Sequence, residues 1–125
     1  MRDLTKIKIA GQEYPIKLDI NVLEEIQEKY GSVNQFEREI LGIKNVKYNT
    51  EGKVENFESC EPSIKAIKTV LPLMINEGMK ITADMENKEY TPVDAETIYR
   101  ECDMDFNVLA DIIHTEYRKC FAVKK

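Results

Sequence analysis

The strongest constraint on the fold is a change of hydrophobic period close to the N-terminus. In residues 7–18, apolar and polar side chains alternate on either side of Gly11-Gln12, the pattern of two strands joined by a tight turn. From residue 22 onward the apolar side chains recur at helical spacing within an arc of about 100°. These side chains are Val22, Leu23, Ile26 and Tyr30. The segment therefore predicts a β-hairpin that leads directly into a helix.

Polar residues that suit helix N-termini precede two helical segments. Asn21 and Glu24 have the spacing of a capping box, in which each side chain bonds a backbone N–H of the first turn. Ser32 and Gln35 repeat that spacing and predict a second, short helix. A glycine follows each helical segment, and we expect each helix to end there.

The segment 43–61 is the least apolar part of the chain. Apolar and polar residues alternate weakly on either side of Asn-Thr-Glu-Gly at 49–52. This pattern favours a second, solvated hairpin through residues 46–48 and 53–57, and a mobile loop is the alternative.

A long apolar segment predicts a central buried helix from Pro62 to Glu77, ending before Gly78. Its apolar side chains cover about 200° of the helix surface, more than a one-sided surface helix needs. They are Ile64, Ala66, Ile67, Val70, Leu71, Leu73, Met74 and Ile75. Pro72 projects on the polar side, where water can satisfy the carbonyl that proline leaves unbonded, so we expect one kinked helix.

The C-terminal third predicts two further helices. Residues 79–91 form an irregular connection or a short strand at Lys80–Ala83, and Thr91 then caps a helix that runs to about Cys102. The final helix runs from Asn107 to Ala122. The chain is thus expected to be a single α+β domain, residues 1–125, with the N-terminal hairpin packed on a mainly helical body.

The final helix carries the predicted partner-binding residues, Glu116, Tyr117 and Phe121. Its apolar arc spans about 220°, so part of it is expected to remain uncovered in the free domain. Tyr117 and Phe121 would then be aromatic anchors for a partner protein. Glu116, within the arc, would keep the free domain soluble and pair with a Lys or Arg of the partner.

Composition argues against two classes of partner. The net charge is −5, and Lys and Arg form no cluster larger than a pair, so nucleic-acid binding is not expected. The longest apolar run, Val70 to Ile75, is far too short to span a bilayer. No apolar segment follows the early Arg2 as it would in a signal peptide, so a cytoplasmic location is expected.

One segment resembles the opening of a calcium-binding loop, with Asp103, Asp105 and Asn107 at alternate positions. Such a loop also needs glycine at its sixth position and glutamate at its twelfth, where this chain has Val108 and His114. Helix capping by Asp105 or Asn107 is therefore favoured over metal binding.

The sequence offers no set of catalytic residues. His114 is the only histidine and lies on a different side of its helix from Cys120. Cys60, Cys102 and Cys120 are too widely spaced for a zinc motif and odd in number, which favours reduced thiols. We therefore predict no catalytic residue, no metal and no cofactor.

Three segments, in order, resemble the tail assembly chaperones of long-tailed phages and prophages of Gram-positive bacteria. They are "IKIAGQEYPIKLDINVLEEIQEKYGS", "VLPLMINEG" and "TPVDAETIYREC". The resemblance implies a small α+β protein of the host cytoplasm that holds the tape-measure protein soluble and helps tail-tube subunits polymerise around it. It implies no catalytic residue and no residue-level binding motif, and it leaves self-association open.

Two other classes of function remain compatible with the residues. One is a protein-binding adaptor or regulatory module of an unrelated pathway. The other is a small enzyme that uses an acid pair, drawn for example from the acid-rich stretch between 94 and 116. A deep polar pocket holding two or more acids with raised pKa would favour the enzyme.

Overall fold

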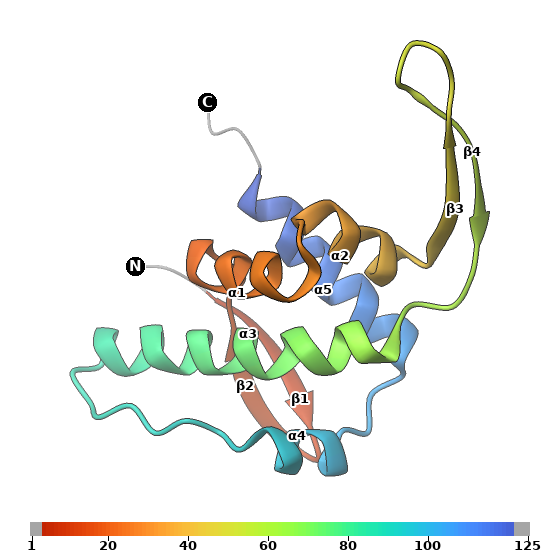
Figure 1. Cartoon of the computed structure of the whole chain (residues 1–125). Coiled ribbons are helices and arrows are strands. Elements are labelled where there is room, and N and C mark those ends of the chain that lie inside the picture. Colours follow the sequence, from red (N-terminus) through yellow and green to blue (C-terminus); the bar gives the residue numbers. More distant parts are fainter. Residues whose placement is uncertain (1–3, 122–125) are drawn as a thin grey trace.

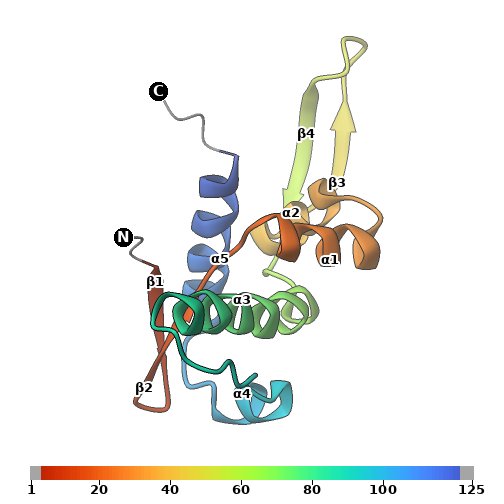
Figure 2. The ribbon, with the colours of Figure 1, turned by 90° about the vertical axis from the view of Figure 1, so that its left-hand side faces the viewer.

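A computed structural model describes residues 4–121 and confirms the α+β class. The elements are β1 (Thr5–Ile9), β2 (Gln12–Ile16), α1 (Ile20–Tyr30), α2 (Val33–Leu41), β3 (Ile43–Tyr48), β4 (Val54–Ser59), α3 (Ile64–Met85), α4 (Ala95–Glu101) and α5 (Phe106–Cys120). Helix α3 crosses the middle of the molecule, with α1, α2 and α5 on one side of it and α4 on the other (Figure 1). The N-terminal hairpin packs across α3, and the second hairpin projects from the body (Figures 1 and 2).

The N-terminal hairpin forms as the alternating pattern predicts. Strands β1 and β2 pair antiparallel, with Ile7 opposite Tyr14, and their apolar side chains enter the core. The turn is Ala10-Gly11, one residue earlier than predicted, and both residues have positive φ, 50° and 83°. Two such residues match the right-handed twist of the strands, which explains the tight connection.

Helix α3 is the centre of the core, as its wide apolar arc predicts. It contacts β2 and all four other helices. Leu71, Met74 and Ile75 are buried, and Met74 and Ile75 have no exposed surface. The backbone carbonyl of Met74 also accepts a hydrogen bond from the N–H of Lys17 at 3.1 Å, which ties the end of β2 to the helix.

The predicted end of this helix at Glu77 is wrong. The helix continues through Gly78 to Met85, so residues Lys80–Ala83 are helical and form no strand. Gly78 lies inside the helix against the backbone of β2, where a side chain would collide with Pro15. The glycine is therefore a site of close packing and not a helix stop.

Pro72 lies within α3, which remains one helix on both sides of it. It is buried, which contradicts its predicted place on a water-exposed polar side. Pro72 lines a surface hollow together with Ala95 and Tyr99 of α4, whereas Lys65 and Lys68 on the same side of α3 remain exposed.

Several caps differ from the predicted ones. Asp19, not Asn21, caps α1, because its carboxylate accepts the backbone N–H of Val22. Asp94, not Thr91, caps α4. The predicted cap at Ser32 is confirmed at the start of α2, and of the two candidates Asp105 and Asn107 it is Asp105 that caps α5. Helix α5 ends at Cys120, and Ala122, its predicted end, lies outside the described residues.

The second hairpin is longer than predicted and stands away from the body (Figure 2). All six residues of β4 are exposed. At its base, the N–H of Cys60 donates to the carbonyl of Gly42 at 2.7 Å. A Cβ atom at Gly42 would lie 2.1 Å from the carbonyl oxygen of Cys60, so only glycine allows the hairpin to leave α2 at this point.

Candidate partner-binding site

Two of the three predicted partner-binding residues are buried inside the domain. Tyr117 is 5% exposed and belongs to an aromatic cluster that joins three helices. Its ring centroid lies 6.2 Å from that of Phe36 in α2, and Phe36 lies 5.6 Å from Tyr30 at the end of α1. Tyr117 therefore packs α5 against α2, and Phe36 in turn packs α2 against α1.

Glu116 is 6% exposed and already has partners within the chain. Its carboxylate accepts hydrogen bonds from the hydroxyl of Thr5 at 2.9 Å and from Lys119 Nζ at 2.8 Å. The interaction joins the start of β1 to α5. A buried carboxylate requires such partners, which are supplied here without a second protein.

Phe121, the third predicted residue, is 54% exposed. Its ring centroid lies 4.9 Å from that of Tyr117, so it extends the aromatic cluster to the surface. Val108, at the other end of the apolar arc of α5, is also exposed. The arc is thus covered along its middle and open at both ends.

A mainly apolar hollow of the described surface lies elsewhere, between α3, α4 and α5. It has a cavity volume of about 300 Å³. Most of its lining residues are apolar, with Lys68 and Tyr99 at its polar side. The apolar lining residues are Ile64, Ile67, Leu71, Ile98, Cys102, Met104, Phe106 and Leu109. We call this hollow the apolar cleft.

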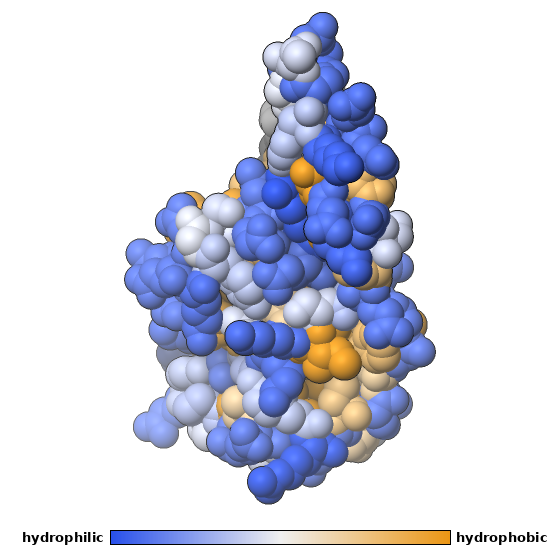
Figure 3. Space-filling model, turned by 45° about the vertical axis from the view of Figure 1, so that its right-hand side comes forward, coloured by the Kyte–Doolittle hydropathy of each residue, from blue (hydrophilic) through white to orange (hydrophobic). Residues whose placement is uncertain are grey.

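The apolar cleft is open to solvent at Ile64, the first residue of α3. This residue lines the cleft and is 55% exposed, while Met104 and Phe106 are half-buried. Hydrophobic residues gather in a patch below the projecting hairpin (Figure 3), on the side of the molecule where α3 begins (Figure 1). Such a concave apolar surface is a usual feature of protein-binding sites.

The cleft was not predicted from the sequence, although one local signal for it was present. Asp105 caps α5, Met104 precedes the cap, and Leu109 lies in the first turn after it. This spacing is that of a hydrophobic staple, in which the residue before the cap packs near the fourth helical residue. Both residues line the cleft. The contribution of α3 and α4 depends on tertiary packing and has no such local signal.

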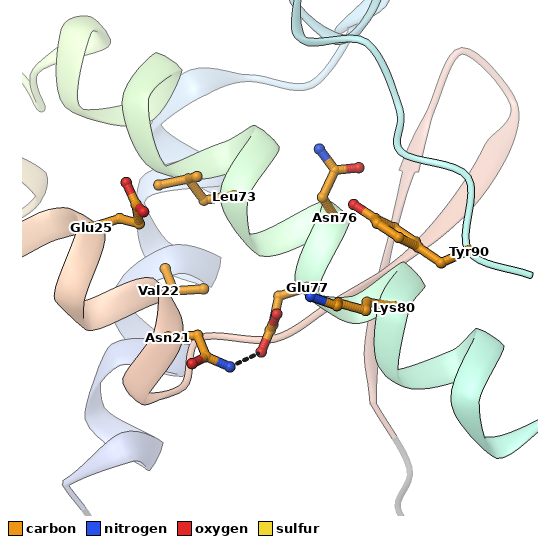
Figure 4. Close-up of a pocket in the computed structure, with 8 residues that line it drawn as sticks. All are labelled: Asn21, Val22, Glu25, Leu73, Asn76, Glu77, Lys80 and Tyr90. Atoms are coloured by element: carbon orange, nitrogen blue, oxygen red, sulfur yellow. Dashed lines mark hydrogen bonds between the residues drawn. The ribbon is translucent and has the colours of Figure 1, made fainter.

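A more polar hollow lies between α1 and α3, with a cavity volume of about 210 Å³ (Figure 4). Asn21 of α1 donates a hydrogen bond to Glu77 of α3 at 2.9 Å. The pKa of Glu77 lies above its ordinary value. The main cause is a hydrogen bond with the side chain of Asp19, and burial is the second cause. These side chains join the two helices across the hollow.

The other side of this hollow is closed by the connection that follows α3. The Asn76 amide pairs with the backbone of Val93 in both directions, at 2.7 and 3.2 Å. Lys80 lies over the ring of Tyr90, with its Nζ 6.0 Å from the ring centroid. The polar groups of the hollow thus hold elements of the fold together.

The histidine and the aspartates considered above as catalytic or metal-binding residues also make contacts within the fold. His114 Nε2 lies 2.9 Å from a Glu37 carboxylate oxygen, which joins α5 to α2. Asp103 accepts the backbone N–H of Ala10, and Asp105 caps α5. Within residues 4–121 no group of three or more His, Cys, Asp or Glu side chains has the arrangement of a metal site.

Searches against known protein families, curated proteins and solved structures found nothing that matches this chain. In the part of the chain that the structure describes, no helix is long and apolar enough to cross a membrane.

Proposed function

We propose that this domain is a non-catalytic chaperone of phage tail assembly. It binds the tape-measure protein, the tail-tube protein, or both, in the host cytoplasm until the tube polymerises. The observation that carries the proposal is the apolar cleft between α3, α4 and α5, whose rim residue Ile64 is exposed. The sequence resemblance supplies the identity of the partner.

The cleft suits an amphipathic helix of the kind a tape-measure protein would present. Such a helix inserts apolar side chains, spaced three or four residues apart, into a groove on its partner. A hollow of about 300 Å³ holds a small number of these side chains. The net charge of −5 would help to keep the resulting complex soluble.

Phe121 provides a second exposed apolar contact. It lies at the C-terminal end of α5, whereas the cleft lies beside the start of the same helix. The two surfaces could contact different parts of a long partner. In the proposal the cleft is the main site, because it is concave and Phe121 is a single side chain.

Co-expression tests the proposal. The tape-measure protein encoded beside this chain is produced with and without it, and the soluble fraction is measured. We expect the tape-measure protein to aggregate alone and to remain soluble in complex with this domain. A tape-measure protein that is equally soluble alone, and that does not co-purify with the domain, would contradict the assignment and favour an adaptor of another pathway.

A further inference from the structure

The hairpin of β3 and β4 has no role in the apolar cleft. Within residues 4–121, β3 and β4 pair only with each other, so each strand has an outer edge with no strand beside it. Isolated two-stranded hairpins are marginally stable in water, and open edges readily pair with further strands. A hairpin that projects this far is suited to pairing outside its own domain (Figures 1 and 2).

The hairpin is nevertheless well supported at both ends. At the tip, the Asn49 side chain accepts the backbone N–H groups of Glu51 and Lys53, at 2.9 and 3.0 Å. Near the body, the N–H of Cys60 donates to the carbonyl of Gly42 at 2.7 Å. The Arg38 guanidinium of α2 also donates to the hydroxyl of Tyr48, the last residue of β3. These contacts hold the strand edges in place before any partner arrives, which reduces the entropy lost on binding.

The two strands carry opposite charge. Strand β3 bears Lys44 and Lys47, whereas β4 bears Glu55 and Glu58. Within the hairpin, Lys44 stands opposite Glu58. When a further strand pairs with an edge, its side chains stand about 5 Å from those of the edge strand on the same face. A basic strand therefore complements the outer edge of β4, and an acidic strand complements that of β3.

We propose that the partner is a second copy of this chain, with β4 of one copy paired antiparallel to β3 of the next. The order β3–β4–β3–β4 then continues one sheet across the copies. Pairing of like edges would place lysines beside lysines or glutamates beside glutamates, which opposes a symmetric dimer. The contact is head-to-tail, so it forms a closed ring or an open chain.

Exposed apolar side chains add to this contact. Tyr48, Val54 and Phe57 are each about half exposed, and all three lie on the hairpin. The ladder is irregular between Lys44 and Lys47, where Asn45 has a positive φ of 53°. Such an irregularity increases the local twist of the strand, and Lys44 and Lys47 remain exposed on either side of it.

Charge reversal tests the proposal by sedimentation velocity on the full chain. The first variant, K44E/K47E, makes both strands acidic, and the second, E55K/E58K, makes both basic. A third variant carries all four reversals, which exchanges the two edges and restores their complementarity. The unfolding temperature of each variant is compared with that of the wild type to check that the domain is folded. It should be nearly unchanged, because the substitutions are exposed and remote from the core.

We expect the wild type to associate as its concentration approaches about 1 mM, more weakly at high salt. Each two-residue variant should associate at least about tenfold more weakly, because like charges then meet. An equal mixture of the two variants should recover association, and the four-residue variant should associate like the wild type. A wild type that stays monomeric, two-residue variants that associate normally, or a mixture that stays monomeric would each overturn the proposal.

The test is independent of the proposed chaperone function. Ile64→Lys, which alters the apolar cleft, should leave self-association unchanged. Loss of self-association in that variant would place the contact at the cleft and overturn the hairpin assignment.

Discussion

Gly78 and Pro15 are in backbone contact at the crossing of α3 and β2. A Cβ atom at Gly78 would lie 2.2 Å from the carbonyl oxygen of Pro15 and 2.8 Å from the nitrogen of Ile16. One turn earlier, the hydrogen bond from Lys17 to Met74 joins the same two segments. The close approach brings the N-terminal hairpin onto the central helix, and it requires a residue without a side chain.

Gly78→Ala should therefore destabilise the domain, although alanine is the better helix former. The added methyl group meets backbone atoms, which cannot rotate aside, so the hairpin must move away from α3. We expect a loss of about 1–3 kcal/mol or more in the free energy of unfolding, measured with urea. Asp84→Ala, an exposed substitution near the end of the same helix, is the control and should change stability by less than about 0.5 kcal/mol. A Gly78→Ala variant as stable as this control would contradict the packing.

Leu71→Ala should reduce the free energy of unfolding by about 2–5 kcal/mol, because it removes a buried side chain from the central helix. Leu71 is almost fully buried, whereas Ile64 in the same helix is mostly exposed. Ile64→Ala is thus the matched control, with a much smaller loss expected. Equal losses of stability in the two variants, measured by thermal unfolding, would contradict the burial of Leu71 in the core.

Much of the fold could be predicted from local periodicity. The alternation in residues 7–18 and the wide apolar arc after Pro62 each reflect a side-chain pattern that one element imposes by itself. The second hairpin was expected on the same ground, with a mobile loop as the alternative, whereas the helix after Thr91 was expected from its cap and proline. Their ends were less predictable, because Asp19 and Asn21 are both good caps and backbone geometry decides between them.

Gly78 shows where local reasoning fails. Glycine after an apolar segment usually ends a helix, but the same residue also permits two backbones to touch. Only the tertiary contact with Pro15 shows which of these two roles Gly78 has. The candidate site has the same difficulty, because Tyr117 and Phe121 lie four residues apart on one apolar arc, and packing against Phe36 buries only the first of them.

Glu116→Ala should destabilise the free domain by about 1–3 kcal/mol, the range for loss of hydrogen bonds to a charged group. The substitution removes the carboxylate that accepts from the Thr5 hydroxyl and from Lys119, and leaves Lys119 only its 3.2 Å hydrogen bond to the Thr5 hydroxyl oxygen. Asp111→Ala, which removes an exposed acid from the same helix, is the comparison. If urea unfolding gives both variants the stability of the wild type, Glu116 does not stabilise the fold, and a partner-binding role becomes the better explanation.

Glu77 should make stability depend on pH in the direction opposite to most carboxylates. Its pKa is raised above 4.5 in the folded domain, first by the hydrogen bond with Asp19 and then by burial. The folded state therefore holds this proton more tightly than the unfolded chain does. The contribution of Glu77 is fully present below pH 4.5 and is lost as pH rises through the raised pKa.

Glu77→Gln keeps a neutral side chain at all pH values and isolates this effect. The stability of the variant relative to the wild type should increase as pH rises through the raised pKa and then become constant. Urea unfolding of both proteins, from below pH 4.5 to neutral pH, gives the difference directly. A difference that stays constant or decreases with pH would contradict the raised pKa.

The apolar cleft can be tested with two isoleucines in equivalent local positions. Ile64 and Ile20 are each the first residue of a helix, and they are 55% and 78% exposed. Only Ile64 lines the cleft. Replacing either by lysine adds the same charge to the same kind of position, so the two variants differ mainly in their effect on the cleft.

The most direct test of the chaperone proposal is the affinity of the purified domain for a soluble helical fragment of the tape-measure protein, measured by titration calorimetry. We expect Ile64→Lys to weaken binding by about tenfold or more, because the lysine charge must be desolvated at the rim of the cleft. Ile20→Lys should bind like the wild type. Equal binding by all three proteins would contradict the apolar cleft as the partner site, and no binding by the wild type would contradict the chaperone function itself.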